Sequence, residues 1–443
     1  MPTEGKRQTA HQVEQPVTAA VWVGHKPLVA PQRTYELMLF GATGFTGRLV
    51  AEYLLAHGPE DLSWALAGRS EAKLKQVRDL LAQDNPRARD LPLVVADSLD
   101  TEAMDRIAQD CKVVCTTVGP YAKYGEPLAG ACARAGTHYC DLTGETHFVR
   151  RIMEAHEATA RDSGARIVHC CGFDSIPSDI GTYMMGEAMK AHGAVLKQVR
   201  TFAGESKGTA SGGTVASMLG ILEDVKRDPS LRKVLGHPYG LNPEGERKGP
   251  DGSDQMGVKF DKALGMWTAP FVMAAINTRV VRRSNALRNY PFTKDFKYSE
   301  VMSTGKGPSG FMRAATMTGG LAAFMGAVQV GPLKSLLQAK VLPKPGDGPS
   351  KEQREAGFFV FRLLGTGQTP EGETVKLRGR VEGTKDLGYG ETAKMPGESA
   401  LCLVCDELQV GGGVWTPASA MGEALLTRLR TAGMVFEVKP EAS

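Results

Sequence analysis

The chain has 443 residues, of which 42% are hydrophobic and 23% are charged, and its formal net charge is +4. This composition is typical of a soluble globular protein with two or three domains. The small net charge gives no support for general nucleic-acid binding, which needs concentrated basic charge.

Residues 1–33 form a polar segment with little regular pattern, and no convincing cleavage signal follows the apolar stretch 17–23. We expect a mostly disordered tail and no secretion. Most of the eight cysteines lie in apolar strand-like runs, which fits a reducing cytoplasm. Cys402 and Cys405 have metal or redox spacing, but no second pair or histidine lies nearby. We therefore expect a buried strand there and no metal site.

A glycine-rich motif follows the apolar run 37–40 and precedes a helix-like run. Strand, glycine turn and helix in this order are typical of the phosphate site of a dinucleotide-binding fold. Gly41 permits the tight turn, Gly44 lets the backbone approach a pyrophosphate, and Gly47 lets the helix pack on the strand. Because glycine spacing alone is a weak signal, the context has to support it. The motif residues assigned to cofactor binding are Gly41, Thr43, Gly44, Phe45, Thr46 and Gly47.

A second strand is predicted over 62–67, and Arg69 and Ser70 follow it at the expected position of the adenosine ribose. An NAD site usually has Asp or Glu at this position. A guanidinium and a hydroxyl instead suit a 2′-phosphate, so the pattern favours NADP(H). The alternative for Arg69 is an ordinary surface arginine.

Strand and helix signals then alternate as far as residue 192, which predicts an α/β fold with a doubly wound parallel Rossmann-type sheet. We assign 34–192 to this NADP-binding domain. The predicted helices are 71–81, 99–109, 126–136 and 145–163, and the further predicted strands are 93–96, 112–118, 138–141 and 165–170.

From residue 193 to 410 the pattern indicates a second, α+β domain, in which residues 236–262 form a long exposed loop. A C-terminal helix over 416–431, within the segment 411–443, is expected to pack back on the first domain. The other predicted elements are strands 198–204, 358–364, 374–381 and 401–404, and helix 217–226.

Residues 314–333 contain no charged side chain and have the length of a membrane span, but several glycines lower their hydrophobicity. We favour a core helix, with a peripheral membrane-surface helix as the first alternative and a span as the second. Arginines and aromatic residues interleave over 279–298. This stretch is either a solvated surface or a contact for an acyl carrier, phosphopantetheine or anionic lipid.

Polar segments follow the fourth, fifth and sixth predicted strands, where such a sheet binds its ligands. Gly119 and Pro120 are expected to border the nicotinamide. Tyr121 and Tyr124 can donate a proton or stack on a ring, or simply pack in the loop. Glu145 can orient substrate or transfer a proton if burial raises its pKa. These three side chains, Tyr121, Tyr124 and Glu145, are the catalytic candidates.

The residues next to these candidates have structural readings as well as functional ones. Thr143 can cap the helix that follows it, and Asp174 or Ser175 can cap the next helix. Gly172 and Phe173 are assigned to the place where the cofactor meets the second domain. Amides near Gly212-Gly213 are candidates for polarising a substrate carbonyl.

Several ordered motifs resemble the saccharopine-dehydrogenase-like oxidoreductases, and among them most closely the trans-acting enoyl reductases. The motifs are GATGFTG, AGRS, VGPYAKYGEP, DLTGE, CGFDSIPSD and SGGT. The resemblance implies hydride transfer from NADP(H) to an α,β-unsaturated, carrier-bound acyl chain in polyketide or lipid biosynthesis. A saccharopine-type imine dehydrogenase is less favoured, because no residues match those that would hold two substrate carboxylates.

A hypothesis of another class is a nucleotide-binding, lipid- or membrane-associated scaffold with little catalysis. We expect a cytoplasmic protein, with peripheral contact at the inner membrane face through 314–333 as a further option.

Overall fold

The structure is a computed structural model and describes residues 33–208, 212–330, 332–333 and 348–441. Nearly all of the predicted N-terminal tail lies outside these residues. Arg33 belongs to the folded part, because its guanidinium donates to the carbonyl oxygens of Ala108, at 3.0 Å, and Ala135, at 2.7 Å.

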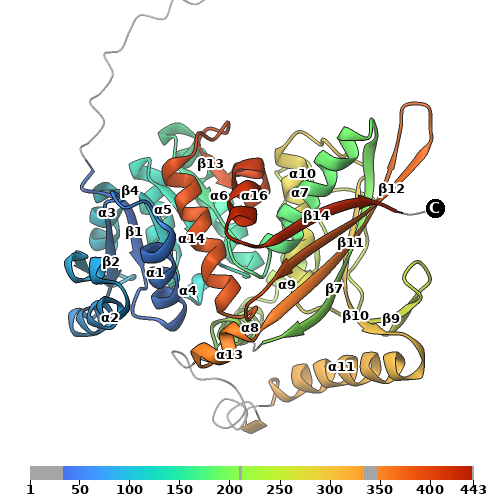
Figure 1. Ribbon diagram of the computed structural model, residues 1–443, viewed down its shortest axis with the longest axis horizontal. Helices are drawn as coiled ribbons and strands as arrows, with labels where there is room; N and C mark the ends of the chain where they lie inside the picture. Colours follow the sequence, from blue (N-terminus) through green and yellow to red (C-terminus); the bar gives the residue numbers. More distant parts are fainter. Residues whose placement is uncertain (1–32, 209–211, 331, 334–347, 442–443) are drawn as a thin grey trace, which may run out of the picture. The chain divides into compact units, whose positions relative to one another are not determined.

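The first sheet has seven strands in the order β13-β6-β5-β4-β1-β2-β3, and every neighbouring pair is parallel (Figure 1). The prediction of a doubly wound parallel sheet is therefore confirmed. Its strands are β1 Tyr35–Phe40, β2 Trp64–Gly68, β3 Leu93–Val95, β4 Cys111–Thr116, β5 His138–Asp141, β6 Arg166–Val168 and β13 Gly413–Trp415. Its helices are α1 Phe45–His57, α2 Glu71–Asp84, α3 Thr101–Asp110, α4 Tyr121–Tyr124, α5 Glu126–Ala135, α6 Thr146–Ser163 and α14 Gly390–Cys405.

This sheet is buried on both faces, as its apolar strands require. Leu37 and Leu39 of β1 lie in an apolar cluster with residues of α1, α2 and α14. Met38, between them, lies in a second cluster with residues of α3, α5 and α6. Successive side chains of a strand point to opposite faces, so β1 contributes side chains to the apolar clusters on both faces of the sheet.

The second sheet also has seven strands, in the order β14-β12-β11-β7-β10-β9-β8, and is mixed, because only β7 and β10 pair in parallel. Its strands are β7 Val195–Lys207, β8 Lys259–Asp261, β9 Met266–Ala269, β10 Lys297–Gly305, β11 Phe358–Gln368, β12 Thr374–Gly383 and β14 Val435–Pro440. The remaining helices include α7 Ile176–Ala191, α8 Gly212–Arg227, α9 Leu231–Gly236, α10 Ala274–Leu287, α11 Gly307–Ala327, α13 Lys351–Glu355, α15 Pro417–Ala420 and α16 Gly422–Thr431.

The strand predicted over 401–404 is wrong, because these residues end helix α14. The helix packs on α1, β4 and β5 of the first sheet. Gly397 makes this approach possible, since a Cβ there would lie 2.6 Å from the Tyr53 ring. Cys402 is buried, and Cys405, the last residue of the helix, is exposed.

Helix α14 also bears on the domain organisation. It covers the first sheet although its residues lie within the range predicted for the second domain. Strand β13 then joins the first sheet beside β6, and β14 returns to the second sheet. The chain therefore crosses between the two sheets more than once after residue 383.

The apolar segment 314–333 is not a core helix, so that prediction is wrong. Most of its described part lies in α11, of which only Gly310 and Ala314 are buried. The helix contacts β9 and β10, and most of its length packs on nothing that the structure describes. No helix within the described ranges is long and apolar enough to cross a membrane.

Candidate cofactor and substrate site

The glycine turn between β1 and α1 has the geometry that a bound phosphate requires. Gly41 has φ +92°, and a Cβ there would lie 2.7 Å from the Thr117 Oγ1 atom. At Gly47 a Cβ would lie 2.2 Å from the Gly41 oxygen, so only glycine lets the helix start this close to the strand. Gly44 is exposed and caps α1 without a side chain, which leaves the amides of the first turn facing an open approach.

The other motif residues frame this turn. Thr43 and Thr46 are half-buried, and a Cβ at Gly68 would lie 3.6 Å from Thr43 Oγ1, so Thr43 connects the turn to the end of β2. The Phe45 ring packs against Tyr389, with ring centroids 4.6 Å apart. Phe45 thus fixes the start of α1 against the segment before α14, and its contact with cofactor stays a prediction.

Arg69 follows the last residue of β2 and is exposed. Its guanidinium has no hydrogen-bond or ion-pair partner among the residues that the structure describes, and it stands beside the turn at the predicted 2′-phosphate position. Ser70 caps α2 by accepting from the Lys73 amide at 3.4 Å. Among the described residues, the Arg69 guanidinium has no partner and could bind a 2′-phosphate, whereas the Ser70 hydroxyl already caps α2. Together with the glycine turn, these residues fit NADP(H).

Glu145 lies at the carboxyl end of β5 and holds the segment that follows β4. Its carboxylate is 1% exposed and accepts from the Tyr121 amide at 2.9 Å and the Ala122 amide at 2.7 Å. It also accepts from the Ser217 hydroxyl of α8 at 2.7 Å. With three donors on one carboxylate, the geometry favours a positioning role for Glu145 over proton transfer. Sequence reasoning missed the contact with Ser217.

The Tyr121 hydroxyl is also occupied. It donates to the Thr116 oxygen at 3.0 Å and accepts from the Leu142 amide at 3.4 Å, and burial raises its pKa well above the usual range. The structure thus favours packing over proton donation for Tyr121. Tyr124 is half-buried beneath the Lys123 ammonium. Gly119 is exposed beside Pro120, at the open edge where the nicotinamide is expected.

A buried polar network that the sequence did not predict fixes the ends of β5 and β6. Asp141 Oδ2 lies 2.7 Å from His169 Nδ1 and 2.9 Å from the Tyr139 hydroxyl. Its Oδ1 accepts from the amides of Thr143 and Cys170, at 3.1 Å each. The sequence feature that could have indicated this network is Asp141 itself, a carboxylate at the end of an apolar strand. A carboxylate that is buried there needs hydrogen-bond donors around it.

Asp174 was predicted only as a helix cap, and the structure contradicts that role. Ser175 occupies the N-cap position of α7, and neither side chain makes a capping hydrogen bond. The Ser175 hydroxyl instead donates to the Asn277 Oδ1 atom at 3.0 Å. Asp174 is half-buried and has no hydrogen-bond partner among the described residues.

Asp174 lies beside Gly144, near the carboxyl end of β5, and its pKa is raised. Its carboxylate approaches Gly144, whose Cβ would lie 3.5 Å from Asp174 Oδ2. Burial raises the pKa of Asp174 to about 6. Burial also raises the pKa of Asp179 and of Glu300 to about 7, but hydroxyl groups donate to both of these carboxyls. Asp174 is thus a carboxyl without a hydrogen-bond partner among the described residues, half protonated at a pH of about 6, at the edge of the sheet where ligands are expected.

Two other predicted positions have mainly packing roles. A Cβ at Gly172 would lie 2.8 Å from the Leu142 Cβ, which explains a glycine there. The Phe173 ring packs on Phe359 of β11, with ring centroids 4.8 Å apart, and so joins the two sheets.

The Gly212 amide, predicted as a candidate for polarising a substrate carbonyl, donates to the Tyr389 hydroxyl at 3.0 Å. It is therefore not free for that role.

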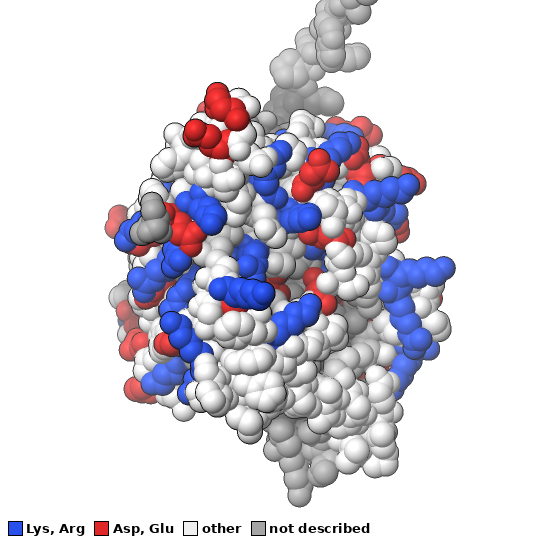
Figure 2. Space-filling model, turned by 90° about the vertical axis from the view of Figure 1, so that its right-hand side faces the viewer, with Lys and Arg blue, Asp and Glu red and all other residues white. Residues whose placement is uncertain are grey.

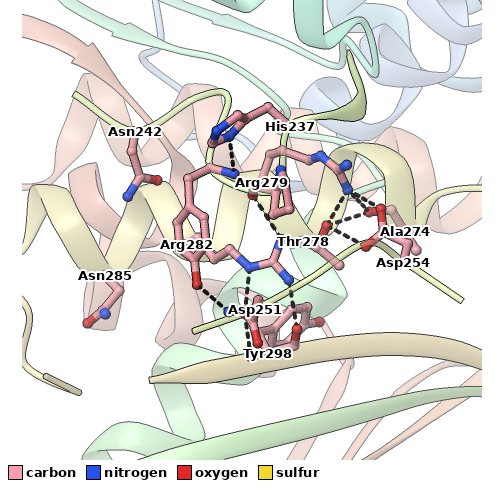
Figure 3. Close-up of polar contacts among 12 residues, drawn as sticks. His237, Asn242, Asp251, Asp254, Ala274, Thr278, Arg279, Arg282, Asn285 and Tyr298 are labelled. Carbon is pink, nitrogen blue, oxygen red and sulfur yellow. Dashed lines mark hydrogen bonds and ion pairs between the residues drawn. The ribbon is translucent and has the colours of Figure 1, made fainter. Parts of the chain in front are cut away.

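The basic stretch 279–298 is neither a solvated surface nor an acyl-carrier contact at its first three arginines. Arg279, Arg282 and Arg283 lie on α10 and are each at most 4% exposed. Figure 3 shows Arg279 paired with Asp254, and Arg282 paired with Asp251 and bonded to the Tyr298 oxygen. These arginines hold the long loop before β8 against α10, a role that a pattern of charges along the sequence does not reveal.

Comparison with known proteins gives consistent results. Residues 37–168 match the saccharopine dehydrogenase NADP binding domain. A trans-acting enoyl reductase of Mycobacterium bovis is 39% identical over 421 residues, which cover 91% of this chain and 98% of that protein. A Mycobacterium tuberculosis protein named provisionally as a trans-acting enoyl reductase is 40% identical over 428 residues, 94% of this chain and 100% of that protein.

Among solved structures, saccharopine dehydrogenase (L-Glu forming) of Saccharomyces cerevisiae has a TM-score of 0.54 and 12% identity. The match covers 92% of this chain and 100% of that chain, and it shows a shared fold.

Proposed function

We propose that this chain, which belongs to the saccharopine-dehydrogenase-like oxidoreductases and, within them, to the family of the trans-acting enoyl reductases, is an NADP(H)-dependent reductase of α,β-unsaturated acyl thioesters. The observation that carries the proposal is the glycine turn with its exposed Gly44 and, beside it, the exposed Arg69, which has no ion-pair partner within the described ranges. The enoyl substrate is inferred from the names of the relatives. We expect it to be carrier-bound, as an intermediate of polyketide or lipid synthesis.

In this proposal the chain's residues bind and orient the cofactor. The amides of the turn at Gly44 receive the pyrophosphate, and Arg69 receives the 2′-phosphate. Glu145 positions the Gly119–Ala122 segment through its two backbone amide contacts, and that segment borders the nicotinamide. When bound, NADPH supplies a hydride for the β-carbon of the substrate.

Asp174 is our candidate for the proton donor. Reduction of an enoyl thioester adds a hydride at the β-carbon and a proton at the α-carbon, so the site needs an acid that is protonated near neutral pH. The Asp174 carboxyl, with a pKa of about 6, is partly protonated at such a pH and has no hydrogen-bond partner among the residues that the structure describes. After transfer it is a carboxylate that takes a proton back from solvent, which closes the balance of protons.

The test is NADPH oxidation by the purified protein in the presence of trans-2-enoyl pantetheine thioesters of several chain lengths. We expect saturated thioester as product, and a rate that falls as the pH rises above about 6. Asp174→Asn should lower kcat about a hundredfold or more while the affinity for NADPH stays unchanged. Asp162→Asn, an exposed aspartate on α6, is the matched control and should behave as wild type.

Other outcomes lead to other functions. NADPH binding without oxidation by any enoyl thioester would favour the nucleotide-binding scaffold. Oxidation of NADPH with an imine formed from an amino acid and a keto acid, but not with enoyl thioesters, would favour a saccharopine-type activity.

A further inference from the structure

Helix α11 presents an apolar surface that nothing in the described chain covers. Met312 is 61% exposed, and Phe311 and Met317 are each 41% exposed. In the second half of the helix, a Cβ at Gly319, Gly320 or Gly326 would meet no atom within 4 Å. Residues 319–327 of this helix are all Gly, Ala, Leu, Phe or Met. A helical segment that is apolar around its whole circumference is normally buried, so its exposure to water is costly.

An aromatic cluster continues this surface at the start of α11. The Trp267 ring of β9 lies 4.9 Å from the Phe311 ring and 5.3 Å from the Phe260 ring of β8, measured between centroids. Phe260 is 49% exposed. Tryptophan and phenylalanine gathered at an exposed apolar edge are typical of surfaces that meet the interface of a lipid bilayer.

The charged groups around this surface are basic. No Asp or Glu occurs from residue 301 to 333, whereas Lys306, the N-cap of α11, and Arg313 within the helix are exposed. On the β8–β9 hairpin Lys259 and Lys262 are exposed, and the one acidic residue, Asp261, is buried and paired with Arg200. In Figure 2, which faces the right-hand side of Figure 1, the described lower part of the molecule is mostly white, and charged side chains of both signs lie above it.

We propose that α11 and the Phe260–Trp267–Phe311 cluster lie in the headgroup region of an anionic lipid surface. The apolar side chains enter the boundary between headgroups and acyl chains, and the flanking lysines and arginine contact lipid phosphates. A second copy of the chain is a poorer occupant, because a two-fold contact along α11 would bring like charges together. The inference does not depend on the reductase activity, so each can fail without the other.

The experiment is flotation of the full-length protein with vesicles of phosphatidylcholine alone or with about one third phosphatidylglycerol. We expect binding to the anionic vesicles that weakens with salt. Met312→Glu with Met317→Glu should lower the partition coefficient about tenfold or more. Arg313→Gln should lower it roughly fivefold, on anionic vesicles only.

The matched control is Leu80→Glu with Val195→Glu, which adds the same charge at two exposed apolar residues away from α11 and should float as wild type. A circular dichroism spectrum and a urea unfolding curve of every variant check that the fold is intact. Failure of the wild-type protein to float with anionic vesicles at low salt overturns the proposal. So does a dimer in light scattering that Met312→Glu with Met317→Glu dissociates, because a second copy would then cover α11.

Discussion

Two alanine substitutions in the same turn should separate its structural glycine from its binding glycine. In Gly47→Ala the new Cβ would lie 2.2 Å from the Gly41 oxygen and 2.8 Å from Thr117 Oγ1. The closest of these atoms belongs to the backbone and cannot turn aside, so α1 must move away from β1. Overpacking of this kind costs about 3 kcal/mol of unfolding free energy.

In Gly44→Ala the new Cβ would meet only the Gly41 oxygen, at 3.4 Å, which is ordinary contact. Gly44 has φ −77° and ψ 161°, which alanine adopts without strain. The loss of a glycine cap costs about 1 kcal/mol or less. The methyl group would, however, stand where the pyrophosphate approaches the backbone, so the affinity for NADPH should fall about tenfold or more.

Urea unfolding and a fluorescence titration with NADPH measure these two quantities on each variant. The reasoning predicts a stable, weakly binding Gly44→Ala protein and an unstable Gly47→Ala protein. Wild-type affinity in Gly44→Ala would refute the assignment of this turn to the pyrophosphate. Wild-type stability in Gly47→Ala would refute the packing argument.

Three further substitutions test other parts of the structure. Glu145→Gln should lower the free energy of unfolding by about 1–3 kcal/mol. In the wild type each carboxylate oxygen accepts from one backbone amide, whereas glutamine has a single acceptor oxygen, so one amide loses its partner. An unchanged midpoint in urea unfolding would contradict this. Asp174→Asn should be more stable than wild type at pH 8 by about 2–3 kcal/mol and equal to it at pH 4. Burial raises the pKa of the Asp174 carboxyl, so the folded wild-type protein prefers the protonated form and loses stability as the pH rises through about 6. Equal stability of the variant and the wild type at pH 8 would contradict this argument. Arg279→Met should cost about 3 kcal/mol, because it leaves Asp254 without its charged partner and with only the Thr278 hydroxyl as a donor. A loss below about 1 kcal/mol would argue against a structural role.

The first sheet could be predicted because its signals are local. The strand His138–Asp141 has the bounds expected from the sequence, and the glycine turn lies between β1 and α1 as its spacing required. Apolar strands that alternate with amphipathic helices carry this information within each segment.

The errors arise where tertiary contacts decide the structure. Residues 401–404 are apolar enough for a strand, but they continue a helix whose glycine at 397 packs against Tyr53. The arginines of α10 resemble a surface patch in the sequence, because the aspartates that neutralise them come from a loop before β8. The segment 314–333 was expected in the core because it lacks charge, and composition alone does not say what covers a helix.

The candidate site divides in the same way into a part that local sequence predicts and a part that tertiary contacts decide. The phosphate turn and Arg69 follow from spacing along the chain. The partners of Glu145, and the lack of a described partner at Asp174, depend on where α8 and the ends of three strands meet. No sequence motif encodes this meeting.

The most direct test of the central claim is a fluorescence titration of wild type, Arg69→Ala and Arg106→Ala with NADPH and with NADH. Arg106 is an exposed arginine on α3 and serves as the matched control. We predict selective NADPH binding by wild type and Arg106→Ala, and a loss of NADPH affinity of about tenfold or more in Arg69→Ala, with NADH affinity unchanged. An equal loss for both nucleotides, or no binding of either by wild type, would contradict the proposed NADP(H) site.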